Sequence, residues 1–503
     1  MTLTIKIPHQ NVLMVIIPVV LSAYTHFWNP LGFPAFHNDE GEYLARGMHV
    51  LVGLGFQDQS FYDHPYFGQL FLGSIFWLID YPHSLHPSVW DMQTVEALYM
   101  IPRMLMGCLA VVDTLLIYKI SEHHYNRNVA FIASILFAVM PLTWLTRRIF
   151  LDSIQLPFLL LSILLSDYAK NSNNKKKTVL TLLSGTCLGL GIFTKLPAFT
   201  MIPLVGFLIY NKTKNRRVFL VLWLIPVTLI PMIWPAYALS IGEFHQWIAG
   251  VSLQMHRISQ PLVDSISAFF KDDPILLLLA AAGMAFAAIK RDYFLLLWVI
   301  PFLIFLYYLG YVSLFYFIPL LPALCIAAAT LIEYLSKKIE NKGVQQALPF
   351  VVISGIAIFG LASISMLLTT DLNSSHFKAA TFVVRYLLHT DNSQFKNDKV
   401  TIISDPFYSW IPQYVFGKNE DYLSYDSKHL PMTKRILLVV DWGFINAMLG
   451  HDKHAVLLQN DYNRTHNIFS IVEETRKYDF NMYPYTNLAE HTTQQRIQIR
   501  TNY

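Results

Sequence analysis

Charged residues are scarce in this sequence. Of its 503 residues, 14% are Asp, Glu, Lys or Arg, and 54% are hydrophobic. A soluble globular protein usually has about 25% charged residues, so this composition favours a polytopic membrane protein. The net charge is only +4, and the sequence has no basic stripe with interleaved aromatic residues. We therefore expect no nucleic-acid partner.

Cysteine is also nearly absent. The three cysteines are Cys108, Cys187 and Cys325, and each lies within an apolar segment. They provide neither a disulfide framework nor the spacing of a metal-ligand set. We expect no cleaved signal peptide, because residues 11–29 are too long for one and no small-residue cleavage site follows. We interpret this first apolar segment as a membrane span.

Long apolar runs dominate the chain up to residue 370. About eleven of them are suited in length and composition to cross a bilayer as helices. They lie near residues 11–29, 97–118, 129–146, 153–169, 178–194, 196–210, 217–240, 274–290, 292–310, 315–335 and 346–368. Basic residues occupy alternate loops between them, such as Lys119 with Arg127 and Lys175 with Lys177. The positive-inside rule places these loops and the N-terminus in the cytoplasm.

The loop at residues 30–96 is acidic and has Arg46 as its one basic residue. The same rule therefore places this loop outside the cytoplasm. Within it, "YFGQLFLGSIFWLI" (66–79) is apolar but short for a span. We expect this segment to lie along the membrane surface or to re-enter it, which also preserves the alternation of sides.

The chain after residue 370 has a different character. Short β-branched runs bounded by polar residues occur at 399–405, 435–441 and 454–460, and a helix is predicted at 376–389. The predicted fold is thus mainly α: a polytopic membrane domain at 1–370, followed by a small soluble α/β domain at 371–503. The parity of the spans places this second domain outside the cytoplasm as well.

Polar residues gather at the outer ends of the predicted spans. Taken singly, an Arg at a span end is usually an anchor at the interface, and an acidic pair in a loop is usually solvated. Here two carboxylates, Asp39 and Glu40, share one side of the membrane with further charged and polar groups. These are His64, Arg103, Arg147, Arg148, Asp152 and Lys195.

This set of residue types fits one kind of chemistry. A carboxylate can accept the proton of an attacking hydroxyl. Guanidinium and ammonium groups can hold a phosphate and stabilise the charge that it gains on leaving. Because nucleotide sugars are cytosolic, a site outside the cytoplasm would take a phosphate donor carried by a lipid.

Several motifs occur in a characteristic order after the acidic pair. They read "HPYFGQ" (64–69), "PRMLMGCLAVVDTLLIYKI" (102–120), "TRRIFLDS" (146–153), "GLGIFTKLPAFTMIPL" (189–204) and "YFIPLLPALCIAAA" (316–329). In this order the sequence resembles the GT-C membrane glycosyltransferases, and among them the dolichyl-phosphate-mannose protein mannosyltransferases and their prokaryotic relatives. The resemblance covers roughly residues 11–335.

The resemblance implies an inverting, mannosyltransferase-like transfer of a sugar from a polyprenyl-phosphate donor to a protein, glycan or lipid acceptor outside the cytoplasm. The acidic motif of the family falls on Asp39 and Glu40, which would be catalytic. Other family positions fall on His64, Arg103, Arg147 and Asp152. A cation that the family carries is replaced here by Gln69, and Lys195 and Arg148 are the candidates to take its place.

These features predict a single in-line displacement. Asp39, with or without Glu40, takes the acceptor proton, and the phosphate departs toward Arg103, Arg147 or Lys195. No cofactor is assigned, although Asp39 and Glu40 could together hold a divalent cation. The alternative is a transporter or lipid flippase, since ionisable residues in membranes also mark translocation paths. A transporter would favour inverted repeats, and we find no duplicated pattern.

Overall fold

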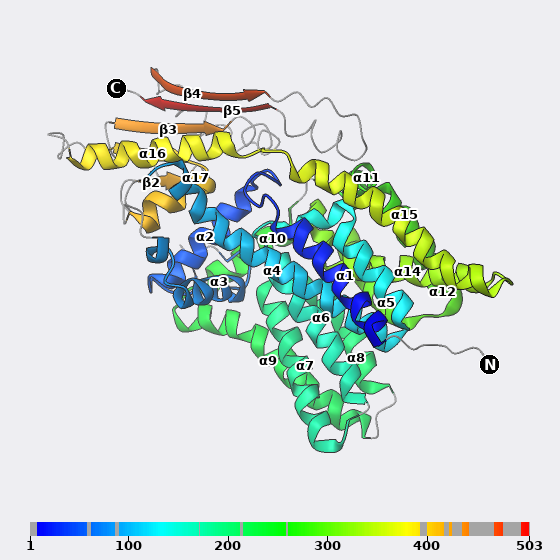
Figure 1. Ribbon diagram of the computed structural model, residues 1–503. Coiled ribbons are helices and arrows are strands. Elements are labelled where there is room, and N and C mark those ends of the chain that lie inside the picture. Colours follow the sequence, from blue (N-terminus) through cyan, green and yellow to red (C-terminus); the bar gives the residue numbers. More distant parts are fainter. Residues whose placement is uncertain are drawn as a thin grey trace.

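The structure is a computed structural model and describes residues 8–57, 62–85, 90–170, 172–211, 215–257, 260–392, 400–416, 422–424, 435–441, 467–475 and 494–501. It is a bundle of apolar helices with a small sheet at one end (Figure 1). The first half of the bundle comprises α1 (Pro8–Phe27), α4 (Met92–His124), α5 (Arg127–Val139), η2 (Pro141–Arg147), α6 (Leu151–Lys170), α7 (Asn174–Thr194), η3 (Leu196–Met201) and α8 (Ile202–Tyr210). The second half comprises α9 (Arg216–Ser240), α10 (Phe244–Met255), α11 (Leu262–Asp272), α12 (Pro274–Lys290), α13 (Tyr293–Tyr308), η4 (Leu314–Leu320), α14 (Leu321–Lys337) and α15 (Lys342–Leu368).

The apolar runs predicted as spans all coincide with apolar helices. Within the described residues, six helices are long and apolar enough to cross a membrane, and two bent pairs raise this number to eight. The shorter apolar helices include α1, α13 and the η3–α8 pair, which occupy further predicted spans. The mainly helical membrane fold is thus confirmed, whereas the number of crossings stays a prediction.

Proline explains where a predicted span is bent. The run at 129–146 forms α5 and η2, whose axes differ by 70°. Pro141 begins η2, and a proline has no N–H to continue the hydrogen bonding of the preceding helix. The second bent pair, α11 and α12, differs by 118° and also breaks just before a proline, Pro274.

Two short helices follow α1 in the acidic loop, α2 (Asn38–Leu51) and α3 (Phe67–Leu78). The 12 residues of α3 span only about 18 Å, at 1.5 Å per residue, which is well short of a bilayer core of about 30 Å. Trp77 and Leu78 at its end are exposed. The short length agrees with a surface location, which itself stays a prediction.

The C-terminal region contains α16 (Ser374–Asn392), α17 (Pro406–Trp410), η5 (Ile411–Val415) and one sheet. Its strands are β1 (Val400–Ser404), β2 (Tyr422–Ser424), β3 (Arg435–Asp441), β4 (Asn467–Thr475) and β5 (Gln494–Thr501), in the order β2-β1-β3-β5-β4. β1 is parallel to both neighbours, and the other pairs are antiparallel. α16 runs along the sheet in Figure 1.

The predicted helix at 376–389 and the strands at 399–405 and 435–441 correspond to α16, β1 and β3. The strand expected at 454–460 lies outside the described residues. The proposed division of the chain near residue 370 falls between α15 and α16 and stays a prediction.

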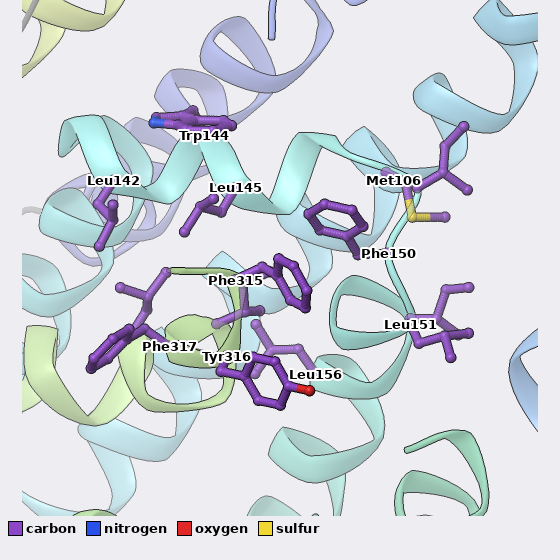
Figure 2. Packing of buried hydrophobic residues seen from close by; sticks show 14 of the residues in the cluster. Met106, Leu142, Trp144, Leu145, Phe150, Leu151, Leu156, Phe315, Tyr316 and Phe317 are labelled. Carbon is purple, nitrogen blue, oxygen red and sulfur yellow. The ribbon is translucent and has the colours of Figure 1, made fainter. Parts of the chain in front are cut away.

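The core lies where the helices meet below the acidic loop. Figure 2 shows Phe150, directly before α6, facing Phe315 of η4. The rings of Phe150 and Phe315 are 4.8 Å apart, and both side chains are buried. These apolar contacts join distant segments of the chain directly beneath the charged residues described next.

Candidate active site

The acidic pair begins helix α2. His37 is the N-cap, and its Nδ1 accepts a hydrogen bond from the N–H of Asp39 (3.3 Å). The carboxylate of Glu40 accepts in return from the N–H of His37 (3.1 Å). This reciprocal arrangement is a capping box, and the N-terminus of a helix favours negative charge. The sequence thus starts a helix here and places both carboxylates in its first turn.

Glu40 is completely buried and ion-paired. Its carboxylate oxygens accept from Nη2 (2.8 Å) and Nε (3.0 Å) of Arg103, which is itself buried. The N–H of Ile149 donates a further hydrogen bond to Glu40 (3.2 Å). A fork of this kind is the strongest pairing that a carboxylate makes with an arginine. Glu40 thus joins α2, α4 and the start of α6.

Asp39 is in the opposite situation, although it is the adjacent residue. Its side chain is 36% exposed, and Nδ1 of His37 lies 3.6 Å from its carboxylate. Burial lowers the pKa of His37, so this ring is neutral near pH 7. The Asp39 charge also acts on Tyr43, His64 and Tyr311, which come from three separate segments.

Asp152 and Lys195 form a second buried ion pair within electrostatic reach of Asp39. Lys195 Nζ lies 2.6 Å from Asp152 Oδ2, and both residues are almost fully buried. The ammonium group also lies over the rings of Tyr316 (4.4 Å) and Phe315 (4.8 Å). The pair links the start of α6 to the end of α7 and borders the η4 aromatic residues.

His64 and its neighbour Asp63 lie on the same side as Asp39. The guanidinium of Arg46 binds Asp63 through two hydrogen bonds (2.6 and 3.2 Å). Burial alone would raise the pKa of Asp63, but the charge and hydrogen bonds of Arg46 outweigh burial and lower it. Burial lowers the pKa of His64 to about 4, so His64 is neutral near pH 7.

Arg147 and Arg148 both bind main-chain carbonyls at the end of α1 and beyond. Arg147 is buried, and its Nη atoms donate to the carbonyls of Thr25 (2.6 Å) and Trp28 (2.6 Å). Arg148 donates from Nη2 to the carbonyl of Ala35 (2.7 Å), and its side chain keeps 14% exposure. Nε of Arg148 also lies 4.0 Å from Glu40 Oε1, and the charges of both Glu40 and Asp39 act on this guanidinium. Of the two arginines, Arg148 is the one with access to a ligand beside Asp39.

The structure therefore brings the predicted residues together as two neighbouring groups. Glu40 and Arg103 form one buried ion pair. Arg147 is close enough to Arg103 for the two positive charges to interact. The remaining residues that were predicted from the sequence surround Asp39. They are His64, Arg148, Asp152 and Lys195.

Other residues of this site were missed by the sequence reasoning. Arg46 and Asp63 were noted only as charges of the acidic loop. Because Arg46 is the one basic residue of that loop, an ion pair with one of its acidic residues could have been suggested. Arg257 is exposed, lies over the Tyr311 ring (5.4 Å) and acts on Tyr316. Gln69, at the position of the missing cation, donates from Nε2 to the carbonyl of Phe56.

The residues present were tested for a divalent cation. In the part of the chain that the structure describes, no group of three or more His, Cys, Asp or Glu side chains could hold a metal ion. Glu40, one of the two ligands considered, has its oxygens occupied by Arg103. Glu40 is thus not free to serve as a metal ligand beside Asp39.

Comparisons with known proteins give one family-model match and several similar folds. Residues 88–237 match the model of the family described as dolichyl-phosphate-mannose-protein mannosyltransferase. A search of curated proteins found no match. ArnT from Cupriavidus metallidurans, solved bound to undecaprenyl phosphate, has a similar fold, with a TM-score of 0.52 and 12% identity. The similarity covers 99% of this chain and 99% of ArnT.

The archaeal oligosaccharyltransferase AglB from Archaeoglobus fulgidus is also similar in fold. Its complex with an inhibitory peptide and a dolichol-phosphate gives a TM-score of 0.51 at 13% identity, covering 83% of this chain. This chain spans only 64% of the AglB chain. The complex of the Archaeoglobus fulgidus oligosaccharyltransferase with Zn and sulfate gives a TM-score of 0.53 at 13% identity, covering 92% of this chain and 72% of that chain. The resemblance predicted from the motifs is thus confirmed: the chain has the fold of the GT-C membrane glycosyltransferases and resembles the dolichyl-phosphate-mannose protein mannosyltransferase family.

Proposed function

We propose that this protein transfers a sugar from a polyprenyl-phosphate donor to an acceptor outside the cytoplasm, with inversion at the sugar carbon. The observation that carries the proposal is the contrast within the acidic pair. Glu40 is ion-paired with Arg103, whereas Asp39 is partly exposed and interacts with the charges of Arg148 and Lys195. The donor class is supported by similar proteins, since ArnT was solved with undecaprenyl phosphate and AglB with a dolichol-phosphate.

In this mechanism Asp39 is the general base. It accepts the proton of the acceptor hydroxyl while that oxygen attacks the sugar carbon. The bond between the sugar carbon and the phosphate oxygen breaks, and the phosphate leaves with the bonding pair. A departing phosphate needs no proton from the protein, so one carboxylate is enough, unlike the two that hydrolyse an ordinary glycoside.

The departing phosphate needs positive charge near Asp39. Arg148 and Arg257 are suited to this role, because both retain exposure and Arg257 has no ion pair among the described residues. Lys195 adds a positive charge but shares it with Asp152. Arg103 and Arg147 were also predicted to bind the phosphate, but their hydrogen bonds go to Glu40 and to main-chain carbonyls. We propose that these two arginines hold the acidic loop.

The remaining site residues would orient the substrates. His64 is neutral near pH 7 and can donate or accept a hydrogen bond to a sugar hydroxyl. The buried Asp152–Lys195 pair fixes the position of the ammonium group over Tyr316. The membrane location of the chain follows from its apolar helices, and the proposed side of the Asp39 site is the outer one.

The test is a transfer assay with the full-length protein in nanodiscs. Radiolabelled polyprenyl-phosphate mannose and other polyprenyl-phosphate sugars are offered with peptide, glycan and lipid acceptors. We expect labelled product and free polyprenyl phosphate in equal amounts, and about 10²- to 10⁴-fold slower formation of both by Asp39→Asn. Movement of the intact lipid donor across the bilayer without release of its sugar would contradict the proposal and indicate a flippase.

A further inference from the structure

The segment between α1 and α2, residues 28–37, leads to Asp39 and has no regular secondary structure. The membrane domain holds one face of it. Arg103 donates from Nη1 to the carbonyls of Pro30 (2.7 Å) and Pro34 (3.0 Å). Its guanidinium also lies 4.0 Å from the centre of the Phe36 ring. This face of the segment is therefore fixed by α4.

The other face is held by Asn373, which lies between α15 and α16 and is completely buried. Its Nδ2 donates to the carbonyls of Leu31 (2.6 Å) and Pro34 (2.9 Å). Its Oδ1 accepts from the N–H of Phe36 (2.9 Å). The Pro34 carbonyl thus accepts from Arg103 on one side and from Asn373 on the other.

Hydrogen bonds continue on both sides of Asn373. The N–H of Leu372 donates to the carbonyl of Gly32 (2.8 Å). Nδ2 of Asn29 donates to the carbonyls of Leu368 (2.8 Å) and Thr370 (2.7 Å). The end of α15 and the segment before α2 are therefore joined along their length, although more than 300 residues separate them in the chain.

A second contact lies just beyond the acidic pair. A Cβ atom added at Gly41 would lie 2.4 Å from the carbonyl oxygen of Pro406, so α2 and α17 touch backbone to backbone. Beside it, the Tyr99 hydroxyl donates to the carbonyl of Phe407 (2.6 Å) and accepts from Nε1 of Trp410 (2.7 Å). The C-terminal region thus contacts the acidic motif both before and after Asp39.

From these contacts we infer that Asn373 is a positioning residue, through which the C-terminal region sets the place of Asp39. The inference rests on the proposed function for its catalytic consequence. The amide of Asn373 serves two carbonyls and one N–H at once, which requires both donors and an acceptor on one short side chain. An irregular segment held in this way presents Asp39 in one geometry, as in-line transfer requires.

Asn373→Asp is the sharpest variant. It keeps the shape and the acceptor for Phe36, but replaces the donor to Leu31 and Pro34 with a second oxygen. Hydrogen exchange of the full-length protein in nanodiscs tests the clamp without any substrate. We expect faster exchange of the amides of residues 31–38, and unchanged exchange in α5, α6 and α14. Unchanged exchange in residues 31–38 would overturn the clamp.

Kinetics tests the positioning. We expect Asn373→Asp to lower kcat roughly 10- to 100-fold, while KM for the lipid donor changes less than twofold, because the phosphate is bound elsewhere. Asn341→Asp is the matched control. It makes the same change at the N-cap of α15, where Asp is an equally good cap, so kcat should be retained. A merely structural Asn373 would lower the melting temperature and leave kcat of the folded protein unchanged.

The outcomes separate the two proposals. Absence of sugar transfer by the unsubstituted protein would contradict the proposed function. The hydrogen-exchange experiment would still show whether Asn373 holds the segment at residues 28–37. Transfer by the unsubstituted protein, with faster exchange but normal kcat in Asn373→Asp, would overturn the positioning role alone.

Discussion

Glu40 and Asp39 are adjacent in the chain, yet they belong to clusters with opposite surroundings. The Glu40 cluster comprises Glu40, Arg103 and Arg147, all buried. Glu40 accepts hydrogen bonds from both ends of the Arg103 fork and from two main-chain N–H groups. Arg103 also serves two main-chain carbonyls. The hydrogen bonds of this cluster are made within the protein.

The Asp39 cluster comprises Asp39, His64, Arg148, Asp152 and Lys195. Its ion pair between Asp152 and Lys195 is buried, but Asp39 is partly exposed and lies 3.6 Å from a neutral His37. The comparison teaches that a buried, paired charge is tied to the fold, because removing its partner leaves an uncompensated charge in the interior. A partly exposed carboxylate such as that of Asp39 can instead interact with a substrate.

The largest expected effect is a loss of turnover on substitution of Asp39, which disrupts the Asp39 cluster. Asp39→Asn keeps the shape and removes the proton acceptor, so turnover should fall about 10²- to 10⁴-fold. Donor binding and the melting temperature should stay near those of the unsubstituted protein. The measurement is the transfer rate beside donor binding in nanodiscs. Near-normal turnover, or equal loss of donor binding, would make Asp39 a structural residue.

The next largest expected effect is a loss of stability on substitution of Arg103, which disrupts the Glu40 cluster. Arg103→Ala leaves Glu40 buried without its partner, which should lower the free energy of unfolding by about 3–5 kcal/mol. Arg103→Lys should recover only part of this, because Lys lacks the planar fork. Unfolding curves in detergent measure both. If instead Arg103→Ala kept full stability and lost donor affinity, Arg103 would bind the phosphate, as the sequence first suggested.

A smaller effect should follow at the contact between α2 and α17. Gly41→Ala places a methyl group against the Pro406 carbonyl, so the two helices must separate. Overpacking of this kind costs about 1–3 kcal/mol. The control is Gly355→Ala on α15, where a Cβ atom would meet nothing within 4 Å and Ala favours the helix. Equal melting temperatures for the two variants would contradict the close contact.

The effect that is smallest near pH 7 is a pH dependence that sharpens the comparison. The pKa of His64 is about 4 in the folded protein and about 6.5 when unfolded. The unfolded state therefore binds a proton first as the pH falls, so stability is full above pH 6.5 and declines toward pH 4. His64→Gln should flatten this part of the melting-temperature curve. An unchanged slope in the variant would mean that His64 titrates normally.

Much of the fold could be predicted from local features of the sequence. Apolar runs of sufficient length became helices, and the β-branched runs at 399–405 and 435–441 became β1 and β3. The bend at Pro141 was not predicted, because the apolar pattern of a run is the same whether the helix axis continues or turns. Helix α11, which meets α12 at Pro274, lies outside the predicted spans. β4 and β5 were missed since many of their residues are polar, and their pairing joins segments distant from β1.

The residues of the site could be named from the sequence, but their roles could not be assigned. Motif order singled out the acidic pair and the arginines, because residue type and spacing are local properties. Which carboxylate is buried depends on Arg103, 63 residues beyond Glu40. The place of Asp39 is proposed to depend on Asn373, at the start of the C-terminal region. Long-range hydrogen bonds of this kind form only when the helices pack. The sequence by itself thus determined which groups are present, and the tertiary structure decided which of them are satisfied by the protein and which stay open to a substrate.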